Sequence, residues 1–226
     1  MVCDDFRNLA GVGSGRSEIL YNSIVRAEAK DAWADLWPNL EAEGRVGEFF
    51  CCKLMYHYLP RISRFMGGDN SHTTPRARHF SPDLVQDFMA WFAGSTWIFI
   101  DRDDVVAQAI SLYFASTTST WRKRLGHPFE APDYEQIPYD FPQIKSLMDA
   151  LVAEKSHWAE FFQHYGLDPI RITYEHAVEG FPDYLSEVFG ALRLPMQPSR
   201  PRLLQKMGGA ANQRLAERFR EDLMRQ

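Results

Sequence analysis

Short continuous apolar runs alternate along the chain with stretches in which apolar residues recur every three or four positions. Three such runs stand at residues 48–53 (EFFCCK), 96–100 (TWIFI) and 169–174 (PIRITY), each a few positions after a glycine. A run of this length beside a turn residue is typical of a strand buried in a sheet. We therefore predict three strands at these positions.

Helical spacing predominates between the runs. Val106, Ala109, Ile110 and Tyr113 repeat at helical intervals, which predicts a helix over residues 105–117, with Asp103 as its N-cap. Further helices are predicted over 141–165, 181–192 and 212–225, and residues 17–36 are either helical or irregular. Because strands alternate with helices, the pattern favours βαβ units and a mostly parallel sheet in one α/β domain of residues 1–226.

Composition narrows the function classes. The 226 residues carry a formal net charge of -5, which argues against a nucleic-acid partner because such domains normally present a basic face. A small anion remains compatible, since it needs only a few N–H groups and one or two arginines. The three cysteines form no CxxC pair and the seven histidines no HExxH pattern, so we expect no metal site and a reducing, cytoplasmic location. With no signal-peptide pattern and no apolar run of about 18 residues, no transmembrane segment is expected.

Candidate chemistry lies where the predicted strands end. In a parallel α/β sheet, ligands bind beyond the carboxyl ends of the strands, and residues 53–56, 101–104 and 173–175 follow the three runs. Arg102 at the second junction can bind a phosphate through two hydrogen bonds, and Ser111, further along the helix, can donate its hydroxyl. Alternatively, Arg102 pairs with one of the nearby carboxylates at positions 101, 103 and 104. Spacing alone leaves both interpretations open.

Residues 99–121, FIDRDDVVAQAISLYFASTTSTW, show the pattern R-x-D/R-x-V-x-Q-A-V/I-S followed by T-x-x-W. This segment resembles the 3′-phosphate-binding strand and helix of bacterial carbohydrate sulfotransferases, of the trehalose 2-sulfotransferase and nodulation-factor sulfotransferase type. Further resemblance lies in K-L-M-Y at 53–56, in T-Y-E at 173–175, in the stretch GRSEILYN and in the tail from residue 206 to 220.

The resemblance implies a P-loop sulfotransferase-like three-layer fold and a function. The donor would be 3′-phosphoadenosine-5′-phosphosulfate, and the acceptor a hydroxyl of a carbohydrate or glycolipid, with no metal required. It assigns donor binding to Arg102, Ser111 and Lys206. It assigns acceptor binding to Lys53, Tyr56 and Trp121, and the role of general base to Glu18.

Plainer interpretations stand beside these roles. Glu18 could be a capping or solvated residue and Lys53 the partner of a nearby acid, while Trp121 could pack the end of the helix. For Tyr174 and Glu175 we favour a structural role.

One family element has no counterpart in the 226 residues. Relatives open with a strand and a P-R-S-G-S-T loop that holds the 5′-phosphosulfate, whereas residues 1–6 resemble the helix after that loop. We therefore expect an N-terminally incomplete sheet, whose open edge favours a homodimer. The alternative function is that of a catalytically inactive sulfotransferase-fold protein that binds a nucleotide or a partner.

Overall fold

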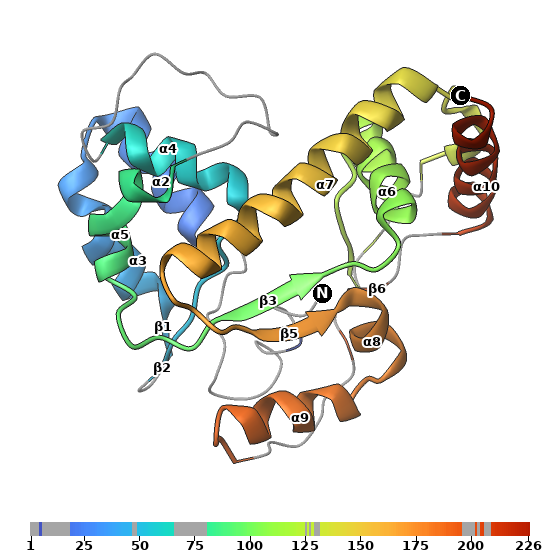
Figure 1. Cartoon of the computed structure of the whole chain (residues 1–226). Helices are drawn as coiled ribbons and strands as arrows, with labels where there is room; N and C mark the ends of the chain where they lie inside the picture. Colours follow the sequence, from blue (N-terminus) through green and yellow to red (C-terminus); the bar gives the residue numbers. More distant parts are fainter. Residues whose placement is uncertain are drawn as a thin grey trace.

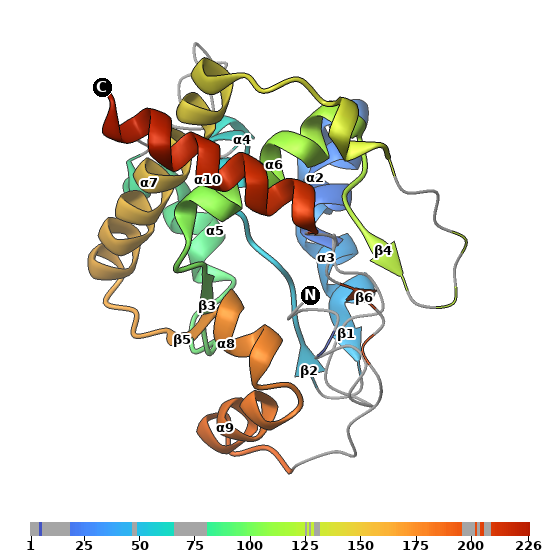
Figure 2. The ribbon, with the colours of Figure 1, turned by 90° about the vertical axis from the view of Figure 1, so that its right-hand side faces the viewer.

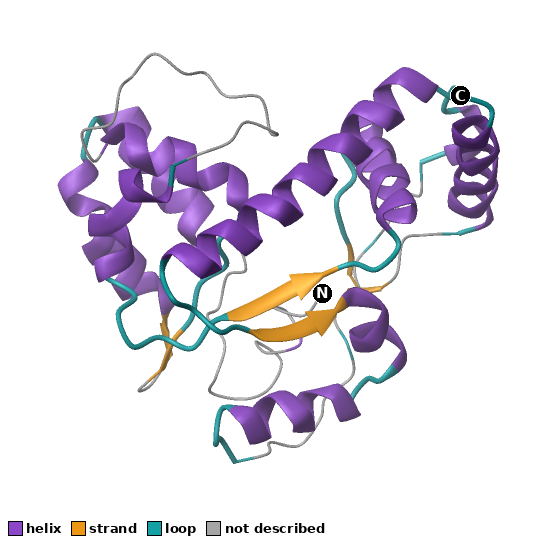
Figure 3. Cartoon of the chain, in the orientation of Figure 1, coloured by secondary structure: helices purple, strands orange, loops and turns teal. Residues whose placement is uncertain are grey.

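The computed structural model describes residues 5, 19–46, 49–65, 81–124, 126, 128, 132–195, 202, 204–205 and 209–226. Helices dominate these residues, and strands are few and short (Figure 1, Figure 3). Two predicted site residues, Glu18 and Lys206, lie outside the described residues.

A parallel pair of strands organises the site. Strand β3 (Ile98–Asp101) pairs with β5 (Ile170–Thr173), so that Ile98 lies opposite Ile170 and Asp101 opposite Thr173. Isoleucine, phenylalanine and threonine suit a pleated, half-buried surface, and both runs were predicted as strands. The two strands end at the same edge, which brings the junction after residue 101 beside the junction after residue 173.

Helices cover both faces of this pair. The long helix α7 (Phe141–His164) crosses one face, and α9 (Asp183–Ala191) lies against the other (Figure 1). The alternation of side chains explains the two contacts. Phe99 packs with Trp158 and Phe162 of α7, whereas Ile98, Ile170 and Ile172 pack towards α9. A helix–sheet–helix arrangement therefore surrounds the pair, and the predicted α/β class is confirmed.

Beyond the strand ends, α6 (Val105–Thr118) follows β3 directly, and α10 (Ala210–Met224) packs across it (Figure 2). Ile110, Phe114, Ile144 and Phe219 form the core between α6, α7 and α10. A short antiparallel pair, β4 (Lys123–Arg124) with β6 (Leu204–Gln205), links the segment after α6 to the segment before α10.

The N-terminal part is a helical layer packed on the C-terminal half of α7. Its aromatic core joins Trp37, Phe88, Phe92 and Trp97 to Phe161. Its elements are α2 (Ile19–Lys30), η1 (Trp33–Asp35), α3 (Leu36–Gly44), β1 (Arg45–Val46), β2 (Phe49–Phe50), η2 (Tyr56–Tyr58), α4 (Leu59–Phe65), η3 (Pro82–Val85) and α5 (Gln86–Ala90).

The run at 48–53 differs from the prediction of a strand in the parallel sheet. Only Phe49 and Phe50 form a strand, which pairs with β1 in a separate antiparallel pair. Pairing is local because only two residues separate β1 from β2, a connection that suits antiparallel neighbours. The Phe50 ring also packs directly on Gly44, where an added Cβ would lie 2.5 Å from a ring carbon. Among the described residues, the parallel sheet therefore has two strands.

Smaller differences concern the helices. The predicted helix 181–192 begins at Asp183 and is preceded by α8 (Tyr174–Glu179). The helices predicted at 105–117, 141–165 and 212–225 are present with shifts of one or two residues. Their apolar spacing was regular enough to locate them.

A buried ion pair ties the start of the described chain to its C-terminal part. The Asp5 carboxylate, 3% exposed, accepts hydrogen bonds from Tyr184 Oη at 2.7 Å and from Arg202 Nη2 at 2.9 Å. The Arg202 guanidinium also lies 4.2 Å from the centroid of the Phe181 ring. Burial and the Asp5 charge raise the pKa of Tyr184. This cluster links position 5 to α9 and to the segment before β6.

Candidate anion site and adjoining pocket

Arg102 is the first residue after β3, and the ends of β3 and β5 hold its side chain from two sides. Its guanidinium carbon lies 4.5 Å from the centroid of the Tyr174 ring, and its Nε lies 3.4 Å from Glu175 Oε1. Both partners follow β5, so the parallel pairing brings them to Arg102. Stacking on an aromatic face leaves the edge of a planar guanidinium available for hydrogen bonds.

No acceptor in the described chain occupies the hydrogen-bonding edge of Arg102. Its ion pair with Glu175 engages Nε at 3.4 Å, longer than a normal hydrogen bond, and this buried Nε has no hydrogen-bond partner among the described residues. The side chain is nonetheless four-fifths buried, at 20% exposure. Such an arginine suits a bidentate anion.

The main chain around Arg102 is fixed by three further interactions. Lys155, from α7, donates to the Arg102 carbonyl at 2.6 Å and lies 2.9 Å from the Asp101 carboxylate. That carboxylate accepts the Arg102 backbone N–H at 2.7 Å, and Glu175 Oε2 accepts the Asp103 N–H at 3.0 Å. The junction is therefore held by α7 and by the end of β5 before any ligand arrives.

Asp104, and not the predicted Asp103, is the N-cap of α6. Its Oδ1 accepts the Ala107 N–H at 2.9 Å, and its Oδ2 accepts Arg220 Nη2 of α10 at 2.7 Å. Partial burial acts to raise the pKa of Asp104, but these two partners outweigh it and the net pKa is lowered. Asp103 supplies a backbone N–H instead, because the turn places its side chain in solvent.

These contacts change the surface ion-pair interpretation of Arg102. The acid beside its guanidinium is Glu175, 73 positions away in sequence, and the carboxylates at 101 and 104 engage Lys155 and Arg220. Local spacing could not reveal this because the partner arrives through strand pairing.

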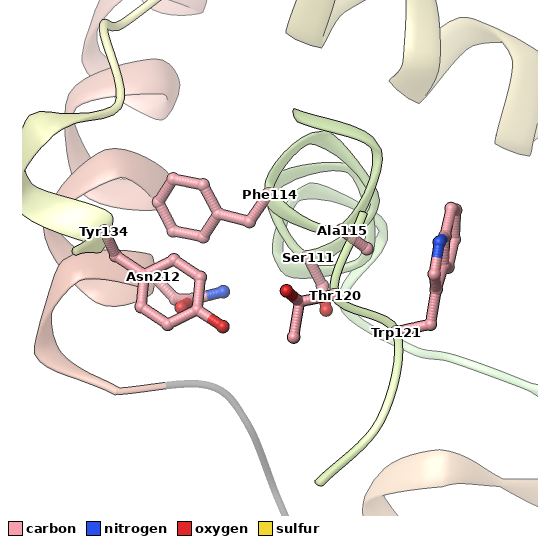
Figure 4. A pocket seen from close by; sticks show the side chains of 7 residues that line it. All are labelled: Ser111, Phe114, Ala115, Thr120, Trp121, Tyr134 and Asn212. Atoms are coloured by element: carbon pink, nitrogen blue, oxygen red, sulfur yellow. The ribbon is translucent and has the colours of Figure 1, made fainter. Parts of the chain in front are cut away.

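Ser111 lies two turns into α6 and lines a pocket with Trp121 (Figure 4). The pocket has a volume of about 290 Å³, including its opening to solvent. Its lining comes from α6, from the segment that follows it, from η4 (Tyr134–Gln136) and from the first turn of α10. The lining residues are Ser111, Phe114, Ala115, Thr120, Trp121, Tyr134 and Asn212.

The end of α6 places Trp121 at this pocket. Thr118 donates its hydroxyl to the Phe114 carbonyl at 2.8 Å, and Ser119 adopts a left-handed backbone with φ 56° that ends the helix. The Trp121 side chain, 55% exposed, follows on the pocket's rim. A tryptophan that only packed against the end of the helix would be largely buried, whereas Trp121 is exposed.

Lys53 and Tyr56 lie elsewhere, in the segment between β2 and α4. Tyr56 is 3% exposed and stacks on His157 of α7 with ring centroids 5.1 Å apart, so its ring is part of the core. Lys53 is half-buried. Because β2 is outside the parallel pair, this junction does not share an edge with Arg102 as the sequence pattern suggested.

Sequence reasoning missed four residues of the site region as candidates. Lys155, Tyr134 and Asn212 had no local signal, because each reaches the site from a distant helix or loop. Glu175 was noted only within the T-Y-E element, where its position directly after a strand was the available signal.

The described part of the chain lacks two kinds of feature. No three histidine, cysteine, aspartate or glutamate side chains gather there as a metal site would require. Among the described helices, none combines the length and apolar character needed to cross a lipid bilayer.

A parallel strand pair flanked by helices defines an α/β protein, and the stacked arginine lies at the strand end where proteins of this class bind ligands. The chain belongs to the Stf0 sulphotransferase family, whose model matches residues 21–222. The predicted resemblance to bacterial carbohydrate sulfotransferases is thereby confirmed.

Two curated proteins illustrate the relationship. The trehalose 2-sulfotransferase of Mycobacterium tuberculosis (strain ATCC 35801 / TMC 107 / Erdman) is 25% identical over 129 residues, which are 57% of this chain and 47% of that protein. The trehalose 2-sulfotransferase of Mycolicibacterium smegmatis (strain ATCC 700084 / mc(2)155) is 27% identical over 128 residues, 57% of this chain and 46% of that protein. The chain spans about half the length of the curated relatives it matches.

Proposed function

We propose that this protein transfers a sulfuryl group from 3′-phosphoadenosine-5′-phosphosulfate to a hydroxyl of a carbohydrate or glycolipid. Family membership and the names of the two relatives support the reaction class and a sugar acceptor. The observation that carries the proposal is Arg102, stacked on Tyr174 with its buried Nε lacking a hydrogen-bond partner within the described chain.

Donor binding centres on the 3′-phosphate. Arg102 supplies a bidentate guanidinium and Ser111 a hydroxyl, since both belong to the β3–α6 unit. Lys206, outside the described residues, adds a second positive charge in this proposal. No metal is needed, because two cations and hydroxyl donors offset the phosphate charge.

The chemical step is an in-line displacement at sulfur. The acceptor oxygen attacks sulfur while the bond from sulfur to the donor's phosphate oxygen breaks, releasing adenosine 3′,5′-bisphosphate. Glu18 takes the acceptor's proton as general base. Trp121 offers an exposed ring to the sugar, and Lys53 and Tyr56 belong to the acceptor side in this proposal, Tyr56 by supporting the segment from the core.

Calorimetric titration with adenosine 3′,5′-bisphosphate tests the donor site. Wild-type protein should bind, and Arg102→Ala should weaken binding by roughly tenfold to a hundredfold, the range for a lost charge-assisted contact. Arg171→Ala is the matched control, because Arg171 of β5 is exposed and contacts the ring of Phe99 on the face towards α7. Absence of binding by the wild type would contradict the proposal, and equal binding by Arg102→Ala would remove Arg102 from the site.

Transfer itself is tested with a labelled donor and a panel of sugars. Glu18→Gln should reduce turnover strongly and leave the affinity for adenosine 3′,5′-bisphosphate nearly unchanged, because the base does not contact the leaving nucleotide. Binding without transfer to any sugar would instead identify a nucleotide-binding module.

A further inference from the structure

Tyr134 presents a buried hydroxyl to the pocket beside Ser111. Its Oη atom is inaccessible to solvent and has no hydrogen-bond partner among the residues that the structure describes. Figure 4 shows the ring on the α10 side of the pocket, with the hydroxyl directed into the space between Asn212 and Thr120. Buried hydroxyls normally have a partner, so one left without it beside a pocket points to a ligand.

The Tyr134 ring is held from two sides. It packs against Phe114 of α6 with centroids 5.1 Å apart. Its neighbour Glu135 pairs with Arg214, which ties η4 to α10. Asp133 caps η4 by accepting the Glu135 N–H at 3.1 Å. The hydroxyl is therefore positioned by both helices that form the pocket, and it does not depend on the ligand for its placement.

The polar side chains of the pocket can all donate hydrogen bonds. The Tyr134 hydroxyl has no hydrogen-bond partner among the described residues, and Ser111 and Asn212 add a hydroxyl and an amide to the lining. The Thr120 hydroxyl donates to the Thr118 carbonyl at 3.2 Å. No carboxylate lines the pocket. Burial raises the pKa of Tyr134, so its hydroxyl keeps its proton at neutral pH. Two hydroxyls and an amide in a lining that contains no carboxylate among its described residues suit an oxyanion.

We propose that Tyr134 is a further donor-binding residue, whose hydroxyl donates a hydrogen bond to the 3′-phosphate beside Ser111 and so selects nucleotides that carry this group. The inference rests on the proposed function, which places the 3′-phosphate at Ser111. Asn212, in the first turn of α10, supplies an amide N–H from the same side of the pocket as Tyr134.

The test compares two nucleotides on three proteins. Wild type, Tyr134→Phe and the control Tyr165→Phe are titrated with adenosine 3′,5′-bisphosphate and with adenosine 5′-phosphate, which lacks the 3′-phosphate. The Tyr165 hydroxyl donates to the Pro82 carbonyl in the N-terminal layer, outside this pocket. Tyr134→Phe should raise the Kd for the bisphosphate by about tenfold or more and leave the Kd for the monophosphate unchanged. Tyr165→Phe should change neither.

The possible results distinguish a failure of the proposed function from a failure of the role proposed for Tyr134. Failure of the wild type to bind the bisphosphate overturns the proposed function itself. Binding that requires Arg102 but is identical in wild type and Tyr134→Phe overturns only the role of Tyr134, as does an equal loss for both nucleotides. If Tyr134→Phe does not fold, Asn212→Ala tests the same wall and should show the same selective loss.

Discussion

The Arg102 guanidinium stacks 4.5 Å from the centre of the Tyr174 ring, although the two residues are 72 positions apart. Parallel pairing of β3 and β5 creates this contact, because Asp101 and Thr173, the residues just before them, lie in register. The stack restricts a side chain that would otherwise lose considerable rotamer freedom on binding an anion. Arg102 is therefore preorganised by the fold.

Glu175→Gln should weaken binding of adenosine 3′,5′-bisphosphate about three- to tenfold, because the carboxylate orients Arg102 Nε and accepts the Asp103 N–H. Calorimetry would measure the change. Glu187→Gln is the control, since Glu187 pairs with His176 at the surface. A positioning role further requires that Glu175→Gln have little effect once Arg102 is already Ala. An unchanged penalty in that background would contradict it.

Asp104→Ala should destabilise the protein by about 1–2 kcal/mol, because it removes both the cap of α6 and the contact with Arg220. Asp103→Ala should cost less than about 0.5 kcal/mol, since the Asp103 side chain is exposed. Urea unfolding followed by circular dichroism distinguishes the two. The lowered pKa of Asp104 means that its contribution is present above about pH 4 and is lost as the pH falls through the folded-state pKa. Equal costs for the two variants would restore Asp103 as the cap.

Tyr139 should make the protein sensitive to alkali. Burial, together with the hydrogen bond to Asp222, raises its pKa to about 12. Because an unfolded tyrosine titrates near a pKa of about 10, the stability that Tyr139 contributes is present below that pH and is lost as the pH rises towards 12.

Tyr139→Phe is the variant that measures this effect. It should be less stable than wild type by about 1 kcal/mol at neutral pH, and the difference should shrink as the pH rises above about 10. Denaturant unfolding across that interval provides the measurement. A difference that stays constant would exclude Tyr139 as the titrating group.

Asp5→Ala should destabilise the protein by about 3–5 kcal/mol, because it leaves the Arg202 charge and the Tyr184 hydroxyl without their buried acceptor. Adding Arg202→Met should recover part of that loss, since the uncompensated charge is then removed. Thermal or urea unfolding of both single variants and the double variant gives the coupling free energy. Strictly additive effects would show that the pair is not coupled in solution.

Trp121→Ala should raise the KM for a sugar acceptor several-fold while leaving the Kd for adenosine 3′,5′-bisphosphate within about twofold, if its exposed ring contacts the acceptor. The melting temperature should change little because the side chain is half exposed. A loss of donor affinity equal to the rise in KM would place Trp121 with the nucleotide instead.

The sequence predicted the β3–α6 unit well because a buried run, an arginine and a regular helical repeat follow one another within 24 residues. It could not predict the strand pairing of residues 48–53, since an apolar run of that length is equally compatible with a local hairpin. The position of Tyr134 in the pocket could not be predicted from the sequence either. This residue comes from a loop rich in proline and tyrosine, whose position depends on packing against Phe114 and on the Glu135–Arg214 ion pair.

Helix α7, about 36 Å long at 1.5 Å per residue, contributes to two separate hydrophobic cores. Its first half supplies Ile144 and Leu151 to the core with α6 and α10, and its second half supplies Phe161 and Phe162 to the aromatic N-terminal layer. Because one continuous helix contributes to both cores, unfolding of either half removes packing partners and weakens the other half. The core formed with α6 and α10 and the N-terminal layer should therefore unfold in a single cooperative transition, with the slowest amide hydrogen exchange along the middle of this helix.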